Sequence, residues 1–306
     1  MKNNESSLTS LVSAFSRAYH AKEDRPLIFN DYVAQNFLLP EEYQAIATNM
    51  TNGIAFFSPK MAEQLKDDRN AILKWVTQIQ LSPTPLARAA YTEKVVLREC
   101  QLGAEQYVIL GAGLDTFAWR HAALTNVTIF EVDHPSTQAF KRARLRHAGI
   151  DNSPHVKFIA MDFTKELSLD KLVAAGFDLS KKTVFSMLGV TYYLTKEIFQ
   201  QLIMLLFQDL PKGSSIIFDI ADEQLFTKAG IFNRVQNMVQ MARAAGEQMV
   251  YASSISDLEK LLANEHLLIY EHLSPQAIQN QFFANRTDDL QAFETIHYIH
   301  AVKNEW

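Results

Sequence analysis

The chain has 306 residues, of which 48% are hydrophobic and 21% charged, and a formal net charge of −5 at pH 7. This composition is typical of a globular protein with a sizeable core, and the acidic balance argues against nucleic acid as a partner. The one cysteine, Cys100, excludes an internal disulfide, and no secretory signal or membrane-spanning apolar run is visible, so we expect a cytoplasmic protein without membrane association.

Helical patterns fill the first part of the chain. They are expected over 8–21, 31–51 and 60–79. No strand pattern or glycine fingerprint precedes residue 100, and Pro83 and Pro85 interrupt the helical patterns. We therefore predict two parts, a helical extension or lid over residues 1–84 and a main domain over residues 85–306.

The stretch Tyr107–Arg120, YVILGAGLDTFAWR, has a different pattern. A buried strand ending at Leu110 is expected to lead into a glycine turn at Gly111 and Gly113, and a helix is expected to begin at Leu114. A strand, a glycine turn and a helix start together indicate a nucleotide site at the carboxyl end of a parallel strand. The alternative is an ordinary tight turn in an α/β protein.

The residues of this turn also indicate which nucleotide it suits. A dinucleotide fingerprint has a third glycine where this chain has Thr116, and the carboxylate of Asp115 would repel a pyrophosphate. A carboxylate at this place instead suits a cationic ligand without phosphates. S-adenosylmethionine (SAM), which carries an ammonium and a sulfonium, fits this requirement.

A second buried strand is expected over 127–133, and it ends at Asp133, which follows Gly113 by 20 residues. This is the spacing at which an acid at the end of the next strand accepts hydrogen bonds from a ribose diol. The alternative, an N-cap for the helix that begins at His134-Pro135, does not explain the spacing.

The rest of the chain continues the alternation of strands and helices. Further strands are expected over 156–161, 183–188, 214–220, 267–272 and 293–302. The helix expected over 135–148 carries a basic run that includes Lys141, which we interpret as a solvated face rather than a nucleic-acid site. A long helical segment over 222–245 is expected to form part of a second lid insertion, residues 222–250.

Four segments together resemble a known family: GAGLDTFAWR, EVDHP, the triplet Met161-Asp162-Phe163 and the segment LGVTYYL that begins at Leu188. They are similar to the leucine carboxyl methyltransferase family, in particular to bacterial SAM-dependent O-methyltransferases of the polyketide O-methyltransferase type. The similarity runs from about Arg25 to the C-terminus. It implies a class I, Rossmann-like α/β fold, in which a seven-stranded and mostly parallel sheet has an antiparallel last strand and is covered by a helical lid.

The resemblance also implies roles for individual residues. Arg88 matches an arginine that contacts the SAM carboxylate, the alternative being an exposed surface arginine. Asp162 and the backbone of Phe163 match the position that holds the adenine amino group, the alternative being a cap for the next helix. Leu188 stands where relatives of the protein-methylating branch mostly have a glutamate, which favours a small-molecule acceptor. The predicted cofactor-binding residues are Arg88, Gly111, Gly113, Asp115, Asp133, Asp162, Phe163 and Leu188.

Three side chains are candidates for acid–base or orienting roles at the acceptor oxygen. Tyr192 is preferred over Tyr193 because adjacent residues cannot face a cleft equally. Asp219 is a base or a satisfied structural carboxylate, and His297 is a base or a histidine buried at the sheet edge. No residues have metal-ligand spacing, so no metal is predicted.

The sequence therefore predicts an enzyme, a SAM-dependent O-methyltransferase that acts on a carboxylate or hydroxyl oxygen of a small molecule. A protein C-terminal carboxyl methyltransferase and a SAM-binding protein without turnover are the alternatives. An oxidoreductase that uses a nicotinamide cofactor is disfavoured by Thr116. The acceptor and the oligomeric state stay open.

Overall fold

The computed structural model describes residues 8–150, 155–162 and 168–304. Within these ranges, seven strands form one sheet in the order β3-β2-β1-β4-β5-β7-β6. Their bounds are β1 Gln106–Leu110, β2 Thr128–Asp133, β3 Val156–Ala160, β4 Thr183–Met187, β5 Ser215–Ala221, β6 Leu267–Leu273 and β7 Ile296–Lys303. Strands β1 to β5 pair in parallel, and β7 lies between β5 and β6 and is antiparallel to both. The predicted fold class is confirmed.

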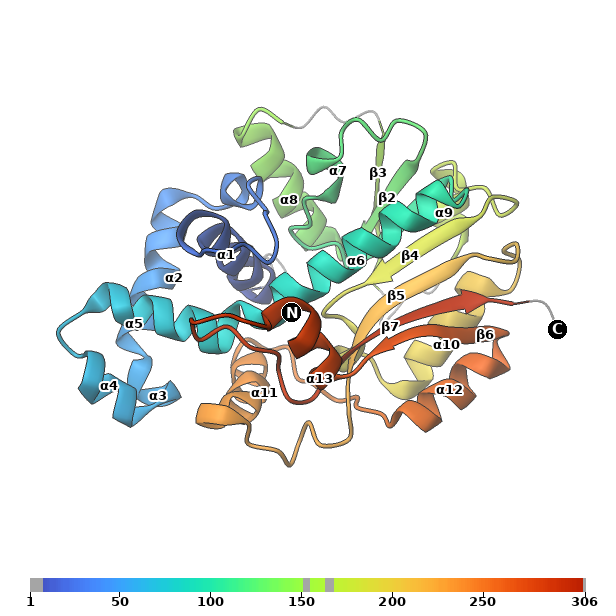
Figure 1. Cartoon of the computed structure of the whole chain (residues 1–306). Coiled ribbons are helices and arrows are strands. Elements are labelled where there is room, and N and C mark those ends of the chain that lie inside the picture. Colours follow the sequence, from blue (N-terminus) through green and yellow to red (C-terminus); the bar gives the residue numbers. More distant parts are fainter. Residues whose placement is uncertain (1–7, 151–154, 163–167, 305–306) are drawn as a thin grey trace.

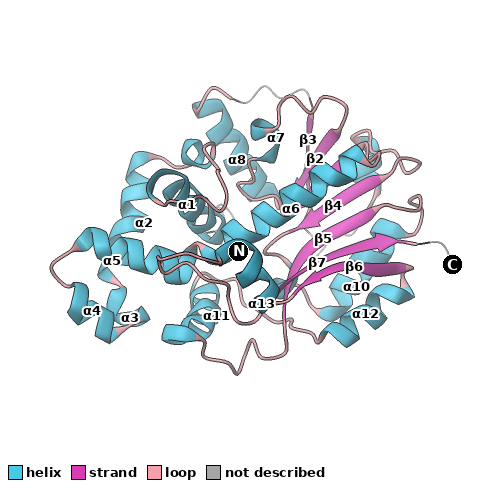
Figure 2. Ribbon diagram, in the orientation of Figure 1, coloured by secondary structure: helices cyan, strands magenta, loops and turns pink. Residues whose placement is uncertain are grey.

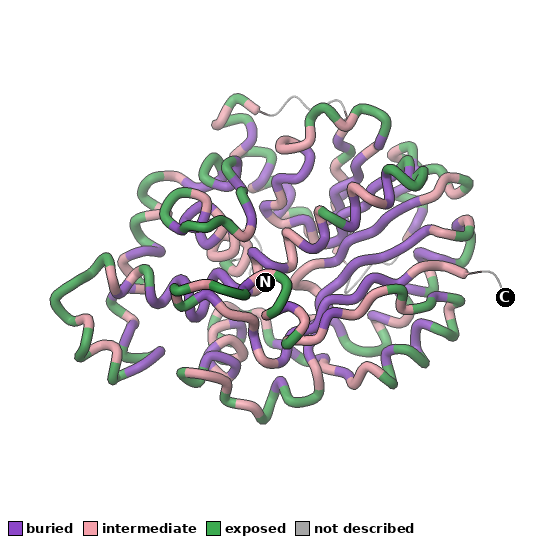
Figure 3. The backbone as a smooth tube through the Cα atoms, in the orientation of Figure 1, coloured by how far each residue is buried: buried purple, intermediate pink, exposed green. Residues whose placement is uncertain are grey.

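Side chains of the central strands alternate between two buried faces, and helices cover both faces (Figures 1 and 2). In β1, Tyr107 and Ile109 belong to the core beneath α6 (Pro83–Gln101), whereas Val108 and Leu110 belong to the core beneath α10 (Lys196–Phe207). Every residue of β1, β4 and β5 is buried (Figure 3). This explains why the sequences of these strands are mostly apolar, as is typical of parallel strands covered on both faces.

Further helices complete the two layers and the region beside the sheet. Helices α8 (Pro135–His147), α9 (Asp170–Ala174) and α12 (Ile255–Asn264) flank the strands. The N-terminal helices and α11 (Arg234–Ala244) gather beyond the carboxyl ends of the parallel strands (Figure 1). The remaining helices are α1 Leu8–Glu23, η1 Ala34–Phe37, α2 Pro40–Asn52, α3 Ile54–Phe57, α4 Pro59–Leu65, α5 Arg69–Val76, η2 Thr77–Leu81, α7 Phe117–Arg120, η3 Thr191–Tyr193, η4 Ile231–Asn233, α13 Pro275–Ile278 and η5 Gln279–Phe283. Of the helices in the described ranges, none combines the length and apolar character needed to cross a membrane.

The prolines expected to separate two parts of the chain do not break the helical path. Helix α5 continues through the π-helical turn η2, and Ser82 keeps right-handed helical angles (φ −86°, ψ −34°) before α6 begins at Pro83. Proline is tolerated here because the first residues of an α-helix need no intrahelical partner for their N–H groups. The division into residues 1–84 and 85–306 stays a prediction, and its boundary falls inside a continuous helical stretch.

The long helix predicted over 222–245 is wrong in extent, since α11 covers only Arg234–Ala244. Phe232 and Asn233 have positive φ angles of 48° and 59°, and Gly230 has a φ of 73°. Left-handed backbone at these positions is incompatible with a continuing α-helix. The chain therefore turns sharply before α11 begins.

The solvated face predicted for α8 is wrong for Lys141, whose side chain is buried. Its Nζ lies 2.6 Å from Glu131 Oε2, and both side chains are 1% exposed. The same Nζ donates to the carbonyl oxygen of Asp115 at 2.7 Å and lies 4.9 Å from the ring centre of Trp119. Lys141 thus connects the turn after β1 to strand β2 and helix α8. The number of charged residues along the helix does not reveal this role.

Candidate active site

A cavity of about 550 Å³ lies at the carboxyl ends of β1, β2 and β4. This is the place where the strand order reverses, because the chain continues from β1 to β2 on one side and returns to β4 on the other. Ligands of open α/β sheets bind at such a crevice. We name two parts of the lining by the roles proposed for them below. The cofactor end consists of Gly111, Gly113, Asp115, Asp133, Asp162 and Leu188, and the acceptor end consists of Gln80, Leu81, Met238, Met241 and Phe293.

The glycine turn presents bare backbone to the cavity. Gly111 and Gly113 have positive φ angles of 69° and 49°. A Cβ atom on Gly113 would lie 2.9 Å from Ser10 Oγ of α1, so a side chain there would displace the Ser10 hydroxyl in addition to straining the positive φ. Helix α7 begins at Phe117 rather than at Leu114, and it has only four residues. A free helix N-terminus for a pyrophosphate is therefore not formed directly after the glycines.

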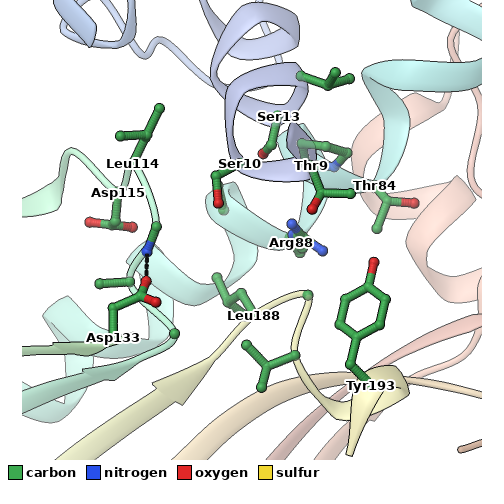
Figure 4. A pocket seen from close by; sticks show the side chains of 18 of the residues that line it. Thr9, Ser10, Ser13, Thr84, Arg88, Leu114, Asp115, Asp133, Leu188 and Tyr193 are labelled. Carbon is green, nitrogen blue, oxygen red and sulfur yellow. Dashed lines mark hydrogen bonds between the residues drawn. The ribbon is translucent and has the colours of Figure 1, made fainter. Parts of the chain in front are cut away.

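Asp133 connects the end of β2 to this turn. Its Oδ2 accepts a hydrogen bond from the N–H of Gly113 at 2.5 Å (Figure 4), and its Oδ1 accepts one from the N–H of His134 at 2.6 Å. Burial raises the pKa of this carboxyl, although the two backbone hydrogen bonds lower it. The N-cap of α8 is His134, not Asp133. The carboxylate thus faces the cavity beside the glycine turn.

Two other acids lie at the cofactor end. Asp115 lines the cavity, and its Oδ1 accepts a hydrogen bond from the N–H of Phe117 at 2.8 Å. Asp162 lines the cavity just after β3, with its Oδ2 3.8 Å from His134 Nε2. The predicted backbone contact of Phe163 lies outside the described residues.

Arg88 is a partly buried side chain of the cavity wall, not an exposed surface arginine. It is 17% exposed, and its Nη1 donates to Asp219 Oδ2 at 2.9 Å. Gly189 has a φ of 69°, and a Cβ atom there would lie 2.7 Å from the guanidinium nitrogens. Glycine at this position, which also has a positive φ, lets the chain after β4 pass close to this cation without displacing it. Leu188, which precedes it, also lines the cavity (Figure 4).

Asp219 is a fully buried carboxylate with three donors around it. Oδ1 accepts from the N–H of Gly189 at 2.7 Å, and Oδ2 accepts from Arg88 and from the hydroxyl of Tyr192. Asp219 is not among the described residues that line the cavity. This geometry agrees with a satisfied structural carboxylate and gives no support to a base that contacts an acceptor.

Both tyrosines after β4 line the cavity, but their hydroxyl groups lie in different surroundings. Tyr192 is 3% exposed and donates its hydroxyl hydrogen to Asp219, and burial followed by the nearby Asp219 raises its pKa well above the usual value. Tyr193 points toward Thr84 and Arg88 across the cavity (Figure 4). Both lie in the 3₁₀ turn Thr191–Tyr193, in which successive side chains are separated by about 120°. Tyr192, the predicted residue, has its hydroxyl occupied by Asp219, so we favour Tyr193 as the phenol that faces an acceptor.

His297 is not among the described residues that line the cavity. Its Nδ1 lies 2.8 Å from His272 Nε2, and its Nε2 lies 3.3 Å from Asp222 Oδ2. The two imidazole rings stack with centres 5.1 Å apart. The structure thus places His297 in a polar group on the β6–β7 side of the sheet and does not bring it together with Arg88 and Tyr193.

The neighbouring His300 is expected to make stability depend on pH. It is fully buried, and burial, followed by the charges of Arg98 and Lys182, lowers its pKa from 6.5 to about 3. Between these values the unfolded chain binds a proton that the folded chain does not, so stability falls as the pH falls. We expect the free energy of unfolding to lose about 1.4 kcal/mol per pH unit below about 6.5 from this group.

Urea unfolding at pH 7, 6 and 5 measures this effect. A His300→Asn variant should show a shallower pH dependence than the wild type, whereas His147→Asn, at an exposed position on α8, should not. Equal slopes in the wild type and His300→Asn would show that His300 is not responsible.

Residues of the N-terminal part of the chain hold the glycine turn from outside, and no sequence pattern indicates them. Arg17 of α1 donates to the carbonyl oxygen of Leu114 at 2.7 Å and to Asp31 Oδ2 at 2.8 Å. Thr116, which occupies the third-glycine position, donates its hydroxyl to Asp31 Oδ1 at 2.8 Å. Thr9 donates to Glu247 on the far side of the cavity. The contacts to Leu114, Thr116 and Glu247 join positions separated by 97, 85 and 238 residues, so no local pattern could predict them.

The cofactor end fits SAM by its own chemistry. Bare backbone at Gly111 and Gly113 allows close approach of a ligand, and Asp115, Asp133 and Asp162 surround that place with carboxylates. Acidic groups favour a ligand that carries an ammonium and a sulfonium. The same groups and the short, occupied start of α7 disfavour a pyrophosphate.

Comparison with known proteins agrees with this fit. The family model described as leucine carboxyl methyltransferase matches residues 10–206. A Bacillus subtilis (strain 168) protein, provisionally named S-adenosyl-L-methionine-dependent methyltransferase YktD, is 56% identical over 304 residues, which are 99% of this chain and 100% of that protein. A Mycolicibacterium paratuberculosis (strain ATCC BAA-968 / K-10) protein with the same provisional class name is 25% identical over 94% of this chain and 90% of its own length.

A solved structure agrees with the fold. The DUF574 family protein of Streptomyces avermitilis MA-4680 matches with a TM-score of 0.56 and 12% identity, over 95% of this chain and 97% of that protein. The family model covers well over half of the chain, so the family predicted from the sequence motifs is confirmed. The chain belongs to the leucine carboxyl methyltransferase family and is thereby a SAM-dependent methyltransferase.

Proposed function

We propose that this chain transfers the methyl group of SAM to a carboxylate or hydroxyl oxygen of a small molecule. The observation that carries the proposal is that the cofactor end and the acceptor end belong to one cavity. The acceptor end is mostly apolar, as small-molecule sites are, and a hydrogen bond from Thr9 to Glu247 joins α1 to the segment after α11 across the cavity. These features, together with Leu188 in place of a glutamate, favour a small acceptor over a protein C-terminus.

Bound SAM would supply a methyl group already activated by its sulfonium, so the protein has to position the acceptor oxygen and exclude water. Asp219 holds Arg88 in a fixed place, and Gly189 lets that guanidinium lie against the end of β4. Burial, followed by the charge of Glu247, raises the pKa of Tyr193, so its phenol stays protonated and can donate a hydrogen bond to an acceptor oxygen. Because Asp219 is occupied, a carboxylate acceptor, which needs no base, suits the site best.

Methyl transfer itself tests the proposal. The purified chain is incubated with SAM and a set of small carboxylic acids and phenols, and mass spectrometry identifies methylated products. We expect O-methylation of at least one small molecule. Methylation confined to the C-terminal carboxylate of a peptide or protein would support the alternative reaction, and SAM binding without transfer to either class would support a binding protein.

Removal of one hydroxyl tests the role of Tyr193. We expect Tyr193→Phe to lower kcat/KM for the acceptor about tenfold, because one hydrogen bond to the acceptor oxygen is lost, and to leave SAM affinity unchanged. Initial rates of S-adenosylhomocysteine release measure the first effect, and calorimetry measures the second. Tyr270→Phe is the matched control, since Tyr270 is 69% exposed on β6. An unchanged kcat/KM in Tyr193→Phe would remove Tyr193 from the acceptor site.

A further inference from the structure

The acceptor end contains a buried amide oxygen that receives no hydrogen bond from any described residue. Gln80 is 7% exposed and lines the cavity, and its Oε1 has no hydrogen-bond partner within the described residues. A buried acceptor left without a donor costs about 1–3 kcal/mol. Such a group is retained when a ligand supplies the missing hydrogen bond.

The orientation of this amide is fixed by the protein. Gln80 Nε2 donates to the carbonyl oxygen of Arg234 at 3.0 Å, so the oxygen is the amide atom left for the cavity. The residue lies in the π-helical turn Thr77–Leu81 between α5 and α6. Turns of this kind inside helices occur frequently at functional sites.

The surroundings of Gln80 indicate a neutral donor. Leu81, Met238, Met241 and Phe293 line the same end of the cavity. The charge of Arg234, whose carbonyl oxygen accepts from Gln80, is already balanced, because its Nε lies 3.0 Å from Glu294 Oε2 and its Nη1 donates to the carbonyl oxygen of Ile79 at 3.3 Å. A cationic donor would lose its hydration here without gaining a free carboxylate from this pair. Burial of a neutral hydroxyl or amide N–H group costs much less free energy.

We infer that Gln80 Oε1 accepts a hydrogen bond from a hydroxyl or neutral N–H group that the acceptor carries in addition to the oxygen that is methylated. The acceptor is then an apolar molecule with two polar groups, one at the cofactor end and one at Gln80. Unbranched methionine side chains at 238 and 241 suit an apolar body of irregular shape. The inference rests on the proposed function and adds the specificity-determining contact.

Matched acceptors test it with the full chain. The probes are benzoic, phenylacetic and cinnamic acids, each without and with ring hydroxyls, in the presence of SAM. Mass spectrometry identifies the methylated oxygen, and kcat/KM values are compared only between acceptors that share it. In the wild type, a ring hydroxyl beyond the methylated oxygen should raise kcat/KM at least about tenfold, since a site built around a hydrogen bond rejects analogues that lack it.

Variants at Gln80 assign this preference to one atom. Gln80→Met removes the amide at similar volume and should abolish the preference. Gln201→Met makes the same replacement at an exposed position on α10 and should behave as the wild type. Calorimetric titration with SAM shows whether each variant is folded and binds the cofactor.

The outcomes separate this inference from the proposed function. If methyl transfer occurs without a preference for the additional hydroxyl, or if Gln80→Met keeps the preference, the role of Gln80 is wrong while the function stands. Turnover of none of the hydroxylated probes, with SAM binding intact, would contradict the acceptor class. Failure of the wild type to bind SAM would contradict the proposed function itself.

Discussion

Replacing Asp133 with alanine is expected to weaken SAM binding about 100-fold or more. The variant loses a carboxylate at the place where the ribose diol of the cofactor is expected, and hydrogen bonds to a charged group contribute about 1.5–3 kcal/mol each. It also leaves the N–H groups of Gly113 and His134 without their side-chain acceptor, so the glycine turn is held less firmly. Both effects act on the cofactor end. Isothermal titration calorimetry with SAM measures the loss.

The matched control for this prediction is Asp178→Ala. Asp178 is exposed and precedes β4, so it lies at the amino end of a parallel strand, away from the cavity. Its replacement should leave the dissociation constant for SAM unchanged. Near-normal SAM affinity in Asp133→Ala would show that the acid at the end of β2 does not hold the cofactor, and the spacing argument from Gly113 would fail.

Replacing Asp219 with alanine is expected to lower the free energy of unfolding by about 3–5 kcal/mol. The carboxylate is fully buried and pairs with Arg88, and removal of one partner of a buried ion pair leaves the other charge uncompensated. The N–H of Gly189 and the hydroxyl of Tyr192 also lose their acceptor. Urea unfolding followed by circular dichroism measures the change.

Two further variants separate structure from catalysis at this position. Asp209→Ala, at an exposed position after α10, should change stability by less than about 0.5 kcal/mol. Asp219→Asn keeps an acceptor oxygen of similar size and should retain part of the stability and of the methyl transfer. Full stability in Asp219→Asn combined with complete loss of turnover would indicate a base, contrary to the geometry in which three donors occupy the carboxylate.

The parts of this molecule that were predictable from sequence depend on local patterns. Mostly apolar segments identified β1, β4 and β5, because both faces of these strands are buried. The glycine turn was predictable because positive φ angles at Gly111 and Gly113 demand glycine. The sequence separation between Gly113 and Asp133 follows from the length of one strand–helix–strand unit. These features allowed the sheet and the cofactor end to be predicted.

The acceptor end could not be predicted in the same way, because long-range contacts create it. Gln80 becomes a candidate only through its hydrogen bond to the carbonyl oxygen of Arg234, 154 residues later. The choice between Tyr192 and Tyr193 depends on a short 3₁₀ turn that propensity does not identify. Lys141 was placed in solvent because a helical charge pattern says nothing about a buried partner such as Glu131.

Calorimetric titration of the purified wild-type chain with SAM, S-adenosylhomocysteine and NAD tests the central claim most directly. The arrangement of carboxylates at the cofactor end and the absence of a third glycine predict micromolar binding of SAM or its product and no binding of NAD. Binding of NAD without SAM would contradict this account, and the cavity between Gly111 and Asp133 would then have to be a variant dinucleotide site.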